Sequence, residues 1–268
     1  MKIEIRPITG YHEYLACEEL QRVVWGAFGA VPYHLLLTVQ KNAGLCLGAF
    51  DMDAPAAPLV GFVFGFLART EDGRLKHASH LAGVLPTYRN AQVGERLKWA
   101  QRDCALAQWL ELMTWTFDPL ISRNARLNLA KLGAVCCTYV RNIYGPEPED
   151  PQGELPSDRF RVDWWLRAPQ VAARHDAPPA LTTAAALRAM APLVNPDPQG
   201  PTDELSGERC LIQIPVEIEA LKASDLPRAR AWRYQLRALA EGAFATGFTV
   251  TDYARDGAIG LYLLERGR

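Results

Sequence analysis

The sequence has no long apolar run and no excess of positive charge. Within its 268 residues no stretch is long and apolar enough to span a membrane. The first residues, Met1–Arg6, alternate in polarity and carry charge, unlike a signal peptide. Lysine plus arginine number 29 against 30 for aspartate plus glutamate, a formal net charge of −1. These absences predict a cytoplasmic protein and argue against nucleic acid or an anionic membrane as a partner.

The sequence also lacks the usual motifs of metal sites and of several enzyme classes. None of the six cysteines forms a CxxC pair, and most lie in apolar segments, as buried small hydrophobes do. His77 and His80 have the spacing of two metal ligands but no matching partners, so no metal is expected. A serine nucleophile elbow, a Walker loop and a dinucleotide fingerprint are missing as well.

What is present is typical of a globular protein, with 49% hydrophobic and 22% charged residues. The patterns predict an α/β fold, in which helices flank a mixed, mainly antiparallel sheet over residues 1–145. Residues 146–210 are predicted to hold a loop, one strand and a Pro/Ala-rich, mostly irregular connection. Residues 211–268 are predicted to form a small β-α-β-β unit that docks on the main sheet.

Apolar periodicity and turn residues place the elements. Strands are predicted over residues 3–8, 45–50, 59–67, 76–85, 110–117, 135–144, 159–166, 211–216, 248–253 and 258–264. Helices are predicted over residues 14–27, 33–40, 93–109, 122–132 and 184–190, and after a cap at Ser224–Asp225. Gly133 is expected to end the fourth of these helices in a left-handed conformation.

One strand-to-helix turn carries most of the functional information. Pro86 ends a strand because it has no N–H to donate, and the turn Thr87–Leu97 opens a long amphipathic helix. The free backbone N–H groups and the dipole of such a helix N-terminus suit an anion such as a pyrophosphate.

The segment Ser79–Tyr144, in the order strand, turn, helix, strand, helix, Gly, strand, resembles the GNAT superfamily of N-acetyltransferases. In that family the fourth strand binds the pantetheine arm of acetyl-CoA. The next turn, Arg/Gln-x-x-Gly-x-Gly/Ala, holds the pyrophosphate. Arg89 and Gly94 match the first and last positions, and Gln92 replaces the middle Gly, which a Gln can do only without a positive φ. The resemblance implies these acetyl-CoA-binding residues: Val84, Leu85, Arg89, Asn90, Ala91, Gln92, Val93, Gly94 and Glu95.

A second stretch, Asn124–Gly133, is similar to the family segment Asn-x-x-Ala-x-x-x-Tyr-x-x-x-Gly. Aligned on Ala125 and Gly133, the family Asn falls at Ser122 and the Tyr at Leu129. That Tyr often protonates the leaving thiolate, which Leu cannot do. The resemblance therefore supports fold and cofactor better than mechanism. The stretch 158–165 and the tail also resemble a little-characterised GNAT branch with a C-terminal extension.

The resemblance implies an N-acyltransferase in which an acceptor amine attacks the acetyl-CoA thioester directly. His80 is a candidate general base, although a structural strand histidine is the commoner case. Tyr144 is a candidate acid. Asp118 could bind the amine or, as we favour, cap the turn before Pro119, and Trp115 is a candidate wall of the acceptor site.

Several alternatives stay open. The chain could be a non-catalytic CoA-binding or protein-interaction module on the same fold, since the Tyr and the middle Gly of the family pattern are replaced. The acceptor could be a small-molecule amine or a protein N-terminus. The C-terminal unit could cover the cleft or form a homodimer interface.

Overall fold

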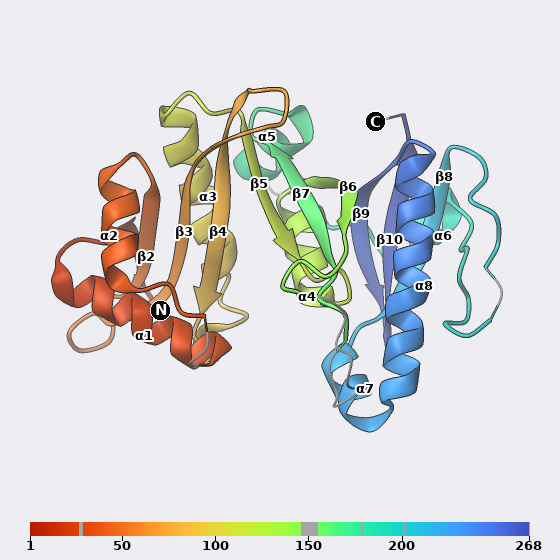
Figure 1. Cartoon of the computed structure of the whole chain (residues 1–268), viewed down its shortest axis with the longest axis horizontal. Helices are drawn as coiled ribbons and strands as arrows, with labels where there is room; N and C mark the ends of the chain where they lie inside the picture. Colours follow the sequence, from red (N-terminus) through yellow and green to blue (C-terminus); the bar gives the residue numbers. More distant parts are fainter. Residues whose placement is uncertain (27–28, 146–154, 178–179, 201, 268) are drawn as a thin grey trace. The chain divides into compact units, whose positions relative to one another are not determined.

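The computed structural model describes residues 1–26, 29–145, 155–177, 180–200 and 202–267 (Figure 1). Two compact units divide the chain. The first comprises Met1–Trp115 with Trp165–Arg167, and the second comprises Thr116–Trp164 with Ala168–Arg268. The boundary between them falls inside the predicted domain 1–145. Each unit has its own hydrophobic core.

The first unit is a five-stranded sheet in the order β1-β2-β3-β4-β5, with antiparallel pairing up to β4 and a parallel β4–β5 pair. Its strands are β1 (Ile3–Pro7), β2 (Leu45–Asp51), β3 (Leu59–Arg69), β4 (Leu75–Val84) and β5 (Leu112–Phe117), whose last two residues belong to the second unit. Its helices are α1 (Tyr11–Trp25), α2 (Tyr33–Lys41), the 3₁₀ turn η1 (Pro86–Tyr88) and α3 (Val93–Ala107).

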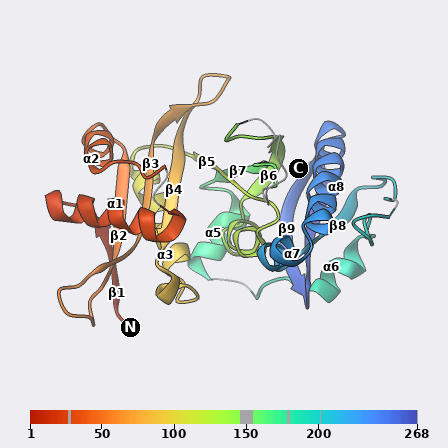
Figure 2. The ribbon, with the colours of Figure 1, turned by 60° about the horizontal axis from the view of Figure 1, so that its bottom comes forward.

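Side-chain alternation along β2 and β3 builds a core on each face of this sheet. Cys46, Phe62 and Phe64 face α1 and α2, whereas Leu47 and Val63 face α3. Figures 1 and 2 show α1 and α2 on one face of the sheet and α3 on the other. The long apolar run of β3 is therefore explained by burial on both faces, as predicted.

The second unit is a sheet in the order β7-β6-β9-β10-β8 with antiparallel pairing. Its strands are β6 (Val135–Val140), β7 (Arg159–Trp165, the last residue in the first unit), β8 (Arg209–Pro215), β9 (Phe248–Asp256) and β10 (Ile259–Arg266). Its helices are α4 (Ser122–Ala125), the π-helical turn η2 (Arg126–Lys131), α5 (Pro169–Asp176), α6 (Ala184–Met190), α7 (Ile218–Ser224) and α8 (Leu226–Ala245). The tail contains the predicted strand, long helix and two strands, with the additional short helix α7 before α8, and it joins the sheet where Cys136 pairs with Val250.

Two helices of the second unit were not predicted. Residues 168–207 were expected to be mostly irregular, but α5 begins there with Pro169 in its first turn, a favourable position for proline. The other missed helix is the short α7. The predicted helix 184–190 is confirmed, with the Thr183 side chain accepting from the Ala186 N–H as its cap. Of the predicted loop 146–157, residues 146–154 lie outside the described residues. Among the described helices, none is long and apolar enough to cross a membrane.

Candidate functional site

Strand β4 carries a bulge at His80. Its neighbours Leu81 and Ser79 pair with the consecutive residues Phe64 and Gly65 of β3, so one residue of β4 is extra. The His80 ring lies exposed beside two phenylalanine rings, with centroids 6.2 Å from that of Phe64 and 6.1 Å from that of Phe66. Partial burial lowers its pKa. The imidazole is therefore neutral and able to accept a proton at neutral pH.

Beyond this bulge the outer edge of β4 presents backbone N–H groups. The Leu85 N–H donates to the Val60 carbonyl at 2.9 Å, so it points into the sheet. Alternation along an antiparallel pair then directs the N–H groups of Ala82 and Val84 to the opposite edge. In the described residues β5 pairs with β4 only next to residues 77 and 78. The N–H groups that face this edge are thus those of Ala82 and Val84, rather than the expected pair Val84 and Leu85.

The edge leads to the N-terminus of α3. Its N-cap residue Gln92 has a φ of 58°, in the left-handed region, and makes no side-chain capping hydrogen bond. The expectation that Gln92 fits only without a positive φ is wrong. The chain accepts a conformation that costs an L-residue about 1–2 kcal/mol. Asn90 has a φ of 71°, which asparagine tolerates better. The first N–H groups of α3, including those of Val93 and Gly94, have no acceptor within the helix.

Gly94 lies at this helix N-terminus, and nothing in the fold itself requires glycine at that position. Its φ is not positive, and a Cβ added there would meet only Val84 Cγ2, at 3.7 Å. Alanine would therefore fit and would favour the helix by about 1 kcal/mol. A glycine here leaves room for another molecule to approach the N–H groups closely. Arg89 and Asn90 are exposed at the same turn.

A buried lysine lies between α3 and the two strands, and the sequence analysis missed it. Lys98 Nζ donates to Ser79 Oγ at 2.9 Å and to Gln101 Oε1 at 3.0 Å, and it stands 3.6 Å from the centroid of the Trp115 ring. These contacts favour the ammonium form, but complete burial outweighs them and lowers the pKa of Lys98 well below its usual value. Burial also lowers the pKa of His77, which accepts from Gln101 Nε2 at 3.1 Å, to about 3.

We expect Lys98→Met to stabilise the protein at neutral pH. Because burial lowers the pKa of Lys98 in the folded chain, the unfolded chain holds this proton more tightly, so wild-type stability falls as pH drops below 10.5. The advantage of the variant should therefore shrink as pH rises toward 10.5. Urea unfolding between pH 7 and 10 measures this, with the exposed Lys41→Met as control. A variant less stable than wild type at pH 7 would mean that the ammonium is charged in the fold.

Asp118 and Tyr144 lie in the second unit, on two sides of Arg159. Asp118 caps its turn, as favoured, by accepting from the Leu120 N–H at 2.9 Å. Its two carboxylate oxygens also accept from Arg233 Nη2, each at 2.7 Å, and Arg159 Nη1 lies 3.6 Å away. Tyr144 is 75% exposed, with the Arg159 guanidinium 5.1 Å from its ring centroid. Of the candidate site residues, Trp115, His80 and residues 84–95 lie in the first unit.

Ser122 and Leu129, which replace the Asn and Tyr of the second family segment, are both buried in the second unit. Leu129 is a fully buried core residue. Ser122 Oγ accepts from the Tyr253 hydroxyl at 2.6 Å and from Arg255 Nε at 2.8 Å. Gly133 ends the helix with a φ of 70°, as predicted. This segment has therefore become a packing surface for the C-terminal strands, a role that no local sequence signal indicated.

Comparison with known proteins adds to this geometry. No family model and no curated protein matches the sequence. Among solved structures, Arabidopsis thaliana NAA60 in complex with a bisubstrate analogue aligns at a TM-score of 0.50 and 15% identity, over 61% of this chain and 99% of that one. A GNAT family acetyltransferase from Elizabethkingia anophelis with acetyl-CoA bound aligns at 0.45 and 15%, over 61% and 97%. Aminoglycoside 6'-acetyltransferase type Ii aligns at 0.47 and 14%, over 63% and 99%.

This chain has the GNAT fold. Together the predicted resemblance and the predicted mixed, mainly antiparallel α/β architecture are confirmed at the level of fold. More than a third of the chain lies outside each of these alignments. At such low sequence identity the shared fold does not identify a substrate, and the evidence for chemistry lies in the residues of β4 and α3.

Proposed function

We propose that the protein is an acetyl-CoA-dependent N-acyltransferase. The observation that carries this proposal is the open edge of β4, which ends at the uncapped N-terminus of α3. An extended thioester cofactor with a pyrophosphate needs both features: backbone groups for its amide arm and N–H groups for its phosphates. Acetyl-CoA would supply the activated acyl group.

The residues at the two ends of this edge fit different parts of the cofactor. The Val93 and Gly94 N–H groups, with the exposed Arg89, would hold the pyrophosphate, and the space at Gly94 allows its close approach. The side chains of Asn90 and Glu95 flank the same turn. The N–H groups of Ala82 and Val84 would donate to the amide arm or to the thioester oxygen, where negative charge develops as the amine attacks.

His80 is the proposed general base. It lies two residues before Ala82 on β4 and is exposed. Its lowered pKa keeps the imidazole neutral at pH 7. Its imidazole would take the proton that the acceptor amine loses on attacking the thioester carbonyl, and the CoA thiolate would leave. Trp115, in the first unit, is retained as a proposed acceptor contact. Tyr144 and Asp118 belong to the second unit, and their roles stay predictions from the sequence.

The base assignment makes a direct kinetic prediction. In the wild type kcat/KM should fall as pH drops below 6.5, through the lowered pKa of His80. His80→Ala should lower kcat at pH 7 by about 10²-fold, a usual effect of losing a general base, and should abolish this pH dependence. Thiol release from acetyl-CoA with a panel of amines and N-terminal peptides measures the rate. The exposed His34→Ala on α2 should behave as wild type. An unchanged pH–rate profile in His80→Ala would remove His80 from the mechanism.

A second candidate function is a non-catalytic CoA-binding or interaction module. The buried Leu129, at the position of the family's acid, favours it. This alternative predicts acetyl-CoA binding without thiol release for any acceptor. Turnover with any amine, in the absence of another protein, contradicts it.

A further inference from the structure

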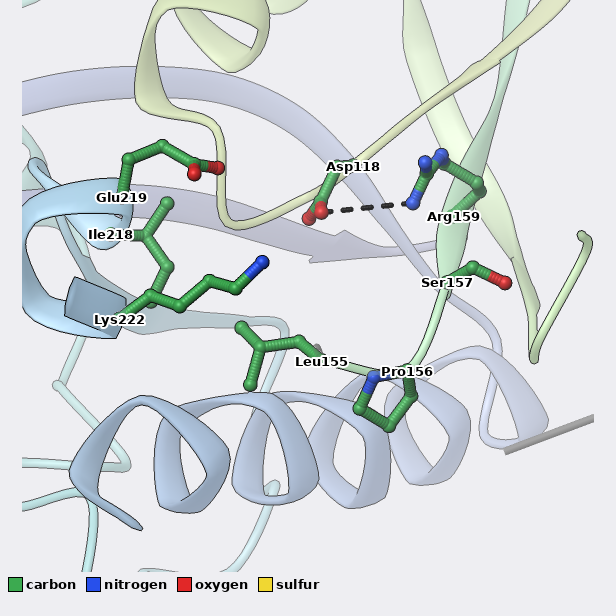
Figure 3. Close-up of a pocket in the computed structure, with 8 residues that line it drawn as sticks. All are labelled: Asp118, Leu155, Pro156, Ser157, Arg159, Ile218, Glu219 and Lys222. Carbon is green, nitrogen blue, oxygen red and sulfur yellow. Dashed lines mark ion pairs between the residues drawn. The ribbon is translucent and has the colours of Figure 1, made fainter. Parts of the chain in front are cut away.

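The second unit contains a small pocket in whose lining only Asp118 was named above as a candidate acceptor contact. Its volume is about 130 Å³. Since a water molecule takes about 30 Å³ of the liquid, the pocket has the volume of about four water molecules, which suits only a small ligand. Figure 3 shows side chains from the residue after β5, from the segment that enters β7 and from helix α7. The lining residues are Asp118, Leu155, Pro156, Ser157, Arg159, Ile218, Glu219 and Lys222.

The charged residues that line this pocket are not all paired within the fold. Asp118 is already neutralised by Arg233, a buried guanidinium bound to both of its oxygens. Its ion pair with Arg159 is longer, at 3.6 Å. Lys222 and Glu219 make no ion pair or side-chain hydrogen bond with the part of the chain that the structure describes. Lys222 and Glu219 are therefore the charged lining residues that remain available to a ligand.

The orientation of Lys222 and Arg159 indicates which chemical group could bind between them. In Figure 3 the Lys222 amine extends across the pocket toward Asp118 and Arg159. Arg159 donates through Nη1 to the Asp158 carbonyl at 2.8 Å, and its guanidinium carries further donors. A carboxylate between the guanidinium and the amine would satisfy both with charge-assisted hydrogen bonds.

The other lining residues limit which groups can be attached to that carboxylate. Leu155, Pro156 and Ile218 are apolar, and they suit a short aliphatic group. Glu219, on the same helix as Lys222, could accept from an ammonium group. A ligand with one carboxylate, a small aliphatic part and at most one amine matches this lining.

We propose that this pocket binds a small aliphatic carboxylate, held between Lys222 and Arg159. Both short-chain carboxylic acids and small α-amino acids contain such a carboxylate. Glu219 distinguishes the two classes, because only an amino acid has an ammonium group that can donate to it. The site is complete within the second unit and does not depend on acetyl-CoA. An experiment can therefore refute carboxylate binding in this pocket without refuting the proposed acyl transfer, and the reverse also holds.

Thermal unfolding and calorimetry with propionate, L-alanine and propylamine test the proposal. Propionate or L-alanine should bind the wild type and raise its melting temperature. Lys222→Met should weaken that binding at least tenfold, whereas Lys222→Arg, which keeps the charge, should retain it. The exposed Arg228→Met on the neighbouring α8 is the control and should bind as the wild type does. If the ligand is an amino acid, L-alanine binds more tightly than propionate, and Glu219→Gln removes that preference.

Three results would overturn the proposal. The first is that neither propionate nor L-alanine binds the wild type. The second is that their binding persists in Lys222→Met at wild-type affinity. The third is that propylamine binds more tightly than both acids, because the pocket would then be a cation site governed by Glu219.

Discussion

Replacing Asp118 with alanine is expected to lower the free energy of unfolding by about 3–5 kcal/mol, the usual cost of removing one partner of a buried ion pair. The Arg233 side chain is only 1% exposed, and both oxygens of Asp118 lie 2.7 Å from its Nη2. Without the carboxylate this guanidinium would be buried with little compensation. The lost cap of the Leu120 N–H adds to the effect.

Urea unfolding of a double-mutant cycle isolates this pair. The double variant Asp118→Ala/Arg233→Met should be more stable than Asp118→Ala alone, because it removes the unpaired charge as well. Asp72→Ala is a matched control. Its partner Arg74 lies at the same 2.7 Å, but both side chains are more than half exposed, so its loss should cost under about 1 kcal/mol. An effect of Asp118→Ala no larger than that of the control would show that the buried pair contributes little.

This stabilising role of Asp118 bears on its proposed contact with an acceptor. A carboxylate bound to Arg233, Arg159 and the Leu120 N–H has less capacity left for an amine than the sequence suggested. If Asp118→Ala unfolds the protein, activity loss in that variant says nothing about acceptor binding. Lys222 and Glu219 are the better positions for testing ligands in the second unit.

Local patterns predicted the elements of the first unit well. The apolar spacing of α3 is confirmed by burial of Val93 and Leu97, and the uninterrupted apolar run of β3 is confirmed as a strand buried on both faces. The turn between β4 and α3 was also found, because Pro86 has no N–H to donate to a strand ladder. Periodicity works where each residue's environment is set by its own element.

The same reasoning failed where distant residues decide the environment. Lys98 was not singled out from the sequence, although Ser79 and Trp115 enclose it. Asp118 and Arg233 are 115 residues apart, so no local pattern could join them. Gln92 was also predicted wrongly, because a glutamine side chain disfavours the left-handed backbone conformation that this residue adopts.

The central claim is that the edge of β4 and the N-terminus of α3 bind acetyl-CoA. Calorimetric titration of the purified protein with acetyl-CoA tests it most directly, together with Gly94→Trp, whose indole would fill the space in front of the helix N-terminus. The matched control is Glu71→Trp, an exposed position in the turn between β3 and β4. We predict one binding site in the wild type and in Glu71→Trp, and affinity reduced by at least about 100-fold in Gly94→Trp, since the phosphate contacts at a helix N-terminus are lost. Absence of binding to the wild type, or equal binding by Gly94→Trp, would contradict the claim.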